Sequence, residues 1–124
     1  MSTLNERYIN NPIIKLSFDF SLLIIDFTTR LNKAGHYVVS KQILRSGTSI
    51  GANIREAQNG ESKADFIHKM KIALKEADET EYWLMLCLHS EHLPNTDEYI
   101  LKLREIIKVL NKIIATSKSK SNAN

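Results

Sequence analysis

The chain has 124 residues, a mass of 14.2 kDa and a formal net charge of +3, which fits one mildly basic domain. Its 43% hydrophobic and 25% charged residues exclude a disordered chain, and 4 Gly with 2 Pro are too few for a turn-rich β-protein. With one Cys, no signal-peptide pattern and no apolar run that could span a membrane, the sequence predicts a cytoplasmic protein that does not enter membranes.

The first expected helix covers about residues 11–34. Asn11 before Pro12 is typical of a helix start, and Gly35 is typical of a left-handed helix end. Apolar residues cover more of this helix than the single stripe that a bundle core requires. We therefore expect a subunit interface, and the candidates are Phe18, Phe20, Leu22 and Ile25.

The second expected helix covers about residues 39–58 and is rich in small and polar residues. Two glycines inside a helix cost about 1 kcal/mol each relative to alanine, so Gly47 and Gly51, one turn apart, predict close approach of a neighbouring helix. A catalytic role for Ser46 or Ser49 is the weaker interpretation, because the spacing places no histidine base beside either.

Two further helices are expected at about residues 62–92 and 96–116. Ser62 with Asp65, and Asn95 with Glu98, stand at the spacing of a capping box. Short connections between four helices favour antiparallel neighbours. The prediction is an all-α, up-down-up-down four-helix bundle that forms oligomers, with one domain over residues 1–117 and a flexible tail over 118–124.

Charge is distributed unevenly along the chain. Residues 76–99 contain seven acidic side chains and no Lys or Arg. In a bundle of alternating direction, this segment lies at the same end as Arg45. We expect a partly buried network of polar groups and ion pairs there. Its predicted members are Arg45, Asn53, Glu56, Glu76 and Glu79.

The other end of the bundle is expected to be basic. Its candidate residues for nucleic-acid or partner binding are Arg55, Lys63, Lys69, Lys71, Arg104, Lys108 and Lys112, with Lys118 and Lys120 beyond them. One interpretation is a polyanion-binding surface, and the other is a solvated helix face that complements a helix dipole. No aromatic residues alternate with these bases along the sequence, so base stacking is not predicted.

Catalytic and metal chemistry are not predicted. Asp65 with His68 is a partial match to the ligand spacing of helical bundles, and His89 with His92 stands beside a helix end. Cys87 lies in an apolar run and is expected to be an inert core thiol. The sequence therefore predicts a protein that is not an enzyme and has no metal or cofactor.

Residues 44–57, which read LRSGTSIGANIREA, resemble a signature of the four-helix-bundle proteins first described from intervening sequences in bacterial 23S rRNA genes. A second similar block runs from Asp65 and Phe66 to Trp83. After Glu56 the chain departs from the pattern of many relatives, which continue with Gly and a basic residue.

The resemblance implies a four-helix bundle that assembles into a ring, commonly a homopentamer. It also implies kinship with the accessory protein of diversity-generating retroelements, which binds a reverse transcriptase and nucleic acid. We accordingly expect a non-enzymatic, ring-forming assembly or accessory module. The alternative is an RNA- or DNA-binding accessory protein that uses the basic end.

Overall fold

The computed structural model describes the backbone of residues 10–122 and the side chains of residues 10–119. Four helices account for almost all of this chain, and the described residues contain no strand. The helices are α2 (Pro12–Lys33), α3 (Tyr37–Ala57), α4 (Lys63–His89) and α5 (Asp97–Asn122). The prediction of an all-α bundle is confirmed.

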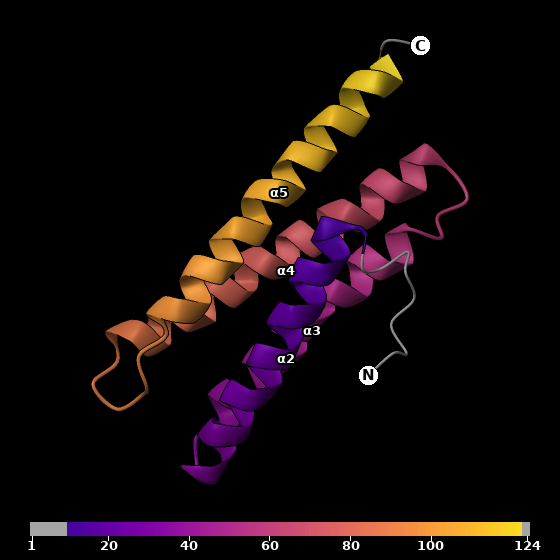
Figure 1. The fold of residues 1–124 in the computed structure, drawn as a ribbon. Helices are drawn as coiled ribbons and strands as arrows, with labels where there is room; N and C mark the ends of the chain where they lie inside the picture. Colours follow the sequence, from indigo (N-terminus) through magenta and orange to yellow (C-terminus); the bar gives the residue numbers. More distant parts are fainter. Residues whose placement is uncertain (1–9, 123–124) are drawn as a thin grey trace.

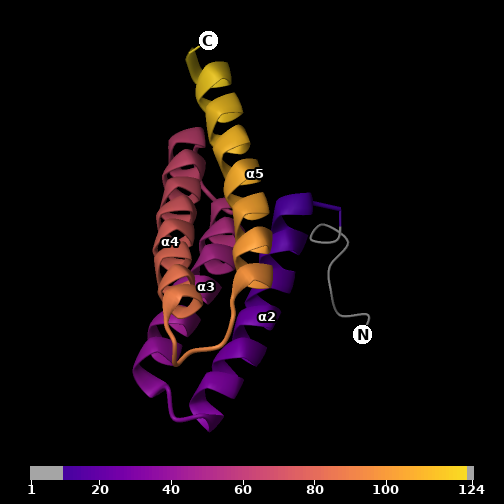
Figure 2. The same cartoon turned by 90° about the vertical axis from the view of Figure 1, so that its left-hand side faces the viewer.

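Each helix packs against the next one, and α5 also packs against α2. Consecutive helices run in opposite directions in both views, as short connections require (Figures 1 and 2). The last turns of α5 extend past the beginning of α4 (Figure 2). This end of the bundle is therefore less enclosed than its middle.

The core consists of large apolar side chains that repeat at helical spacing on the inward face of every helix. The largest of them are Phe20, Ile24, Phe27, Leu31, Ile43, Ile50, Ile54, Met70, Leu84, Leu103, Ile106 and Leu110. Phe20 was expected at a subunit interface, and this prediction is wrong. Its side chain is 1% exposed within a single chain, because it shares the inward face of α2 with Ile24 and Phe27.

Local hydrogen bonds explain where the helices begin and end. Gly35 has φ 86°, and the amide of His36 donates to the carbonyl of Leu31 over 2.9 Å, which closes α2. Ser62 Oγ accepts from the amide of Asp65 over 3.1 Å at the start of α4. Before α5, the side chain of Asn95 accepts from the amide of Asp97 rather than from Glu98.

Two helix ends differ from the prediction. Helix α4 ends at His89 rather than near residue 92, and α5 continues to Asn122 rather than ending near residue 116. No Gly or Pro follows residue 94, so nothing in the sequence of α5 stops the helix. Helix α5 thus includes most of the predicted tail. Residues 1–9 of the predicted domain and residues 123–124 of the predicted tail lie outside the described residues.

Candidate interaction surfaces

Small residues bring α2 and α3 close together. Ser40 Oγ donates to the backbone carbonyl of Thr28 over 3.0 Å. A Cβ atom added at Gly47 would lie 2.9 Å from Cγ2 of Ile24, and one added at Gly51 would lie 3.4 Å from a backbone oxygen of α2. The structure thus has the close approach that the two glycines predict.

Beside this contact, α2 exposes a line of large apolar side chains. Phe18, Leu22 and Ile25 are 45%, 51% and 45% exposed, and their spacing places them on one face of the helix. Leu44 on α3 is 39% exposed, and because α2 and α3 are antiparallel, the pairing of Gly47 with Ile24 places it near the level of Phe27, two residues beyond Ile25. We call these four residues the outer strip.

Helix α4 exposes a second apolar surface, on a different helix from the outer strip. Tyr82 and Leu86 are 59% and 43% exposed and lie one turn apart. The rings of Tyr82 and Trp83 also pack in a T-shaped arrangement, with 5.4 Å between ring centroids. We call Tyr82 and Leu86 the α4 patch.

The expected ion-pair network forms in part, at the surface. Arg45 on α3 bonds Glu76 on α4 over 3.3 Å and also bonds Glu79, which accepts from the indole nitrogen of Trp83 over 3.3 Å. The Arg45 side chain is 49% exposed, and those of Glu76 and Glu79 are 21% and 40% exposed. The two glutamates are thus partly buried and Arg45 is exposed, because these side chains reach across the rim of the α3–α4 seam.

The other two predicted members do not join this cluster. The Asn53 amide donates to the Ser49 carbonyl of its own helix over 2.8 Å, and Glu56 pairs with Lys69 over 2.9 Å. The buried polar contact between α3 and α4 was missed. The Thr80 hydroxyl donates to Ser46 Oγ over 2.9 Å, and neither side chain is exposed.

The predicted basic residues lie in different surroundings. Lys69 is paired with Glu56, and Arg104 bonds Glu81 over 3.3 Å. Arg55 lies exposed on the last turn of α3. A side-chain hydrogen bond with Lys118, and then charge repulsion from it, lower the pKa of Lys71. The side chain of Lys120 lies outside the described residues.

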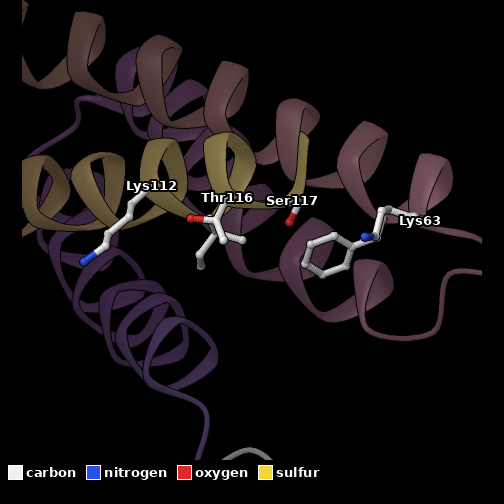
Figure 3. A pocket seen from close by; sticks show the side chains of 6 residues that line it. Lys63, Lys112, Thr116 and Ser117 are labelled. Atoms are coloured by element: carbon white, nitrogen blue, oxygen red, sulfur yellow. The ribbon is translucent and has the colours of Figure 1, made fainter. Parts of the chain in front are cut away.

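Lys63 and Lys112 instead line opposite ends of a groove between the start of α4 and the end of α5 (Figure 3). The groove has a volume of about 490 Å³, and its lining residues are Lys63, Phe66, Lys112, Ile113, Thr116 and Ser117. Figure 3 shows Thr116 and Ser117 between the two lysines. The sequence pattern did not reveal that Phe66 belongs here, because Lys112 is on a distant segment of the chain.

The side chains considered for catalysis are occupied or buried. Ser49 Oγ donates to the Arg45 carbonyl over 2.6 Å, and burial raises the pKa of the Cys87 thiol. Within residues 10–119, no three His, Cys, Asp or Glu side chains gather as metal ligands would. None of the described helices has the length and apolar character needed to cross a bilayer.

The comparisons with known proteins agree with this architecture. A crystal structure of a protein of unknown function from the S23 ribosomal protein family of Bacteroides thetaiotaomicron is 48% identical, with a TM-score of 0.79. The similarity covers 82% of this chain and 97% of that chain. No curated protein matches the sequence. A family model described as 23S rRNA-intervening sequence protein matches residues 10–112, and the chain therefore belongs to that family.

Proposed function

We propose that this protein is a non-catalytic assembly module that associates with copies of itself through the outer strip. The observation that carries the proposal is the exposure of three large apolar side chains, Phe18, Leu22 and Ile25, on consecutive turns of α2. Burying the exposed part of each of these three side chains would contribute on the order of 1 to 2 kcal/mol to the free energy of association. A contiguous apolar strip on a helix that already has a complete inward face is typical of a protein interface.

The close approach of α2 and α3 lets the outer strip span both helices. The glycines of α3 let α2 lie so close that a methyl group does not fit at Gly47 and barely fits at Gly51. Leu44 can then extend the apolar surface of α2 across the seam. A surface on two helices offers a partner more contact area than one helix alone.

The α4 patch supports a closed ring over a symmetric dimer. A ring requires two different surfaces that fit each other, whereas a twofold dimer uses one surface twice. The outer strip and the α4 patch are two such surfaces on different helices. The resemblance to ring-forming relatives favours five subunits. In this assembly, the outer strip of each copy meets the α4 patch of the next copy.

Three matched variants test the assembly. Leu22→Lys changes the outer strip, Leu86→Lys changes the α4 patch, and Leu101→Lys is the control, because Leu101 is 67% exposed on α5 outside both surfaces. A lysine in a desolvated apolar interface loses its hydration, so we expect the first two variants to be monomers. The control should keep the mass of the parent assembly. Light scattering after size exclusion gives the masses, and circular dichroism checks folding.

Mixing the variants distinguishes a ring from a dimer. A ring predicts that Leu22→Lys and Leu86→Lys combine into a heterodimer, since each supplies the surface that the other lacks. If Leu86→Lys alone keeps the parent mass, the ring is rejected. If the parent protein has a mass of 14.2 kDa at every concentration, self-association itself is rejected.

A further inference from the structure

The groove between the start of α4 and the end of α5 combines an apolar floor with a cationic rim. Phe66 and Ile113 line the groove and are half-buried residues that pack against the core. Lys63 and Lys112 line the groove from different helices, and Thr116 and Ser117 lie between them (Figure 3). No acidic side chain lines it. Such a groove fits an anion that also carries an apolar face.

We propose that this groove binds one unpaired nucleotide of a single-stranded nucleic acid. The base lies against Phe66 and Ile113, and the flanking phosphates bind Lys112 and Lys63. This inference goes beyond self-association and does not depend on it. The proposal differs at Phe66 from the sequence pattern, which predicts no base stacking at the basic end.

Charge supports a polyanion over a single small anion. The ion pairs among the described residues involve neither lysine of the groove. Lys108, exposed one turn before Lys112, lies about 6 Å from it along the helix axis and continues the row of cations beyond the groove. Each phosphate that such a row neutralises adds affinity that depends on salt.

The lowered pKa of Lys71, a lysine near this end of the bundle, also supports the binding of an anion. A side-chain hydrogen bond between Lys71 on α4 and Lys118 on α5, and then the repulsion between their charges, lower the pKa of Lys71. A bound phosphate would relieve that repulsion. Glu61 and Asp65 stand close by in the sequence, but neither lines the groove.

The aromatic floor supports an unpaired base. An aromatic side chain can stack only on a base that is free of its partner strand, because a paired base has its faces covered within the duplex. A volume of about 490 Å³ lies within the range of pockets for small ligands, and it suits a single nucleotide unit. The hydroxyls of Thr116 and Ser117 can donate to phosphate or base oxygens.

Binding of two labelled strands to the whole 124-residue chain, in whatever oligomeric state it has in solution, tests the proposal. One strand is a run of uridines, and the other has the same number of phosphates but no bases. The parent protein should bind the uridine strand more tightly in fluorescence anisotropy. Phe66→Leu keeps an apolar side chain in the core contact and should weaken binding of the uridine strand about tenfold. Binding of the abasic strand should not change.

Charge variants supply a second measurement that does not depend on Phe66. Lys63→Gln and Lys112→Gln should each weaken both strands and reduce the slope of affinity against salt by about one. Lys102→Gln is the matched control, because Lys102 is exposed on α5 away from the groove, and it should leave the slope nearly unchanged.

Four results of the strand-binding measurements would overturn the proposal. These are equal binding of both strands by the parent protein, equal weakening of both strands by Phe66→Leu, an equal loss with Lys102→Gln and Lys112→Gln, and no binding at low salt. Competition by uridine monophosphate at the strand's own affinity would show a site for free nucleotides and would overturn it as well.

Discussion

Two phenylalanines of α2 show how strongly one residue's position decides its role. Phe18 is 45% exposed and Phe20 is 1% exposed, although only one residue separates them. Two positions on a helix are about 200° apart, so these rings lie on opposite faces. Phe20 stabilises the fold of one chain, and Phe18 is left exposed on its surface.

Gly47 and Gly51 also differ in what their missing side chains allow. At Gly47 the nearest atoms belong to the fully buried Ile24, at 2.9 and 3.1 Å from an added Cβ. At Gly51 the nearest atom is the hydroxyl oxygen of Ser21, at 3.3 Å, which belongs to a side chain that can rotate. The first contact leaves no room for a methyl group, and the second leaves nearly enough.

We therefore predict that Gly47→Ala destabilises the protein and Gly51→Ala does not. Alanine gains about 1 kcal/mol of helix propensity at either position, but overpacking at Gly47 costs about 1 to 3 kcal/mol. The free energy of unfolding should fall by about 1 kcal/mol for Gly47→Ala and stay within about 0.5 kcal/mol for Gly51→Ala. Urea denaturation measures both. Equal effects of the two substitutions would show that the helices adjust freely at this contact.

Helix starts provide a comparison between two elements. Ser62 accepts a hydrogen bond from the amide of Asp65 at the start of α4, whereas Asn11 before α2 makes no side-chain capping bond. The start of α2 relies instead on Pro12, whose fixed backbone angle suits the first helical turn. The two starts therefore depend differently on their capping residues.

Ser62→Ala should cost about 1 kcal/mol of unfolding free energy, because it leaves an amide of the first turn without its acceptor. Asn11→Ala should cost much less, and it serves as the control. Thermal melts followed by circular dichroism compare the two variants. A larger loss from Asn11→Ala than from Ser62→Ala would contradict this account of the helix starts.

The sequence was sufficient to predict the elements, since apolar spacing, Gly35 and the capping pair at Ser62 are local signals. The end of α5 was placed too early, because a polar sequence without Gly or Pro remains helical after its apolar stripe has ended. Side-chain partners were harder to predict. Which carboxylate Arg45 reaches, and that Phe66 shares a groove with Lys112, depend on how two helices are rotated against each other.

The two proposed binding surfaces lie at different places on the molecule. The outer strip lies along α2 and α3, and the nucleotide groove lies between α4 and α5 at the end where α5 extends past its neighbours (Figure 2). Assembly through the strip and the α4 patch would leave one groove on each subunit. Several grooves in one assembly would bind a strand more tightly than a single groove could.

Self-association also predicts how stability depends on concentration. When folded subunits bind one another, mass action stabilises the folded state as protein concentration rises. A tenfold increase in concentration should raise the melting temperature of the parent protein by about 4 °C. Leu22→Lys removes the contact and should melt at one temperature at every concentration, while Leu101→Lys should follow the parent. Scanning calorimetry across a concentration series makes the comparison. A parent melting temperature that does not move would mean that the exposed side chains of α2 are tolerated by a lone chain and stabilise nothing.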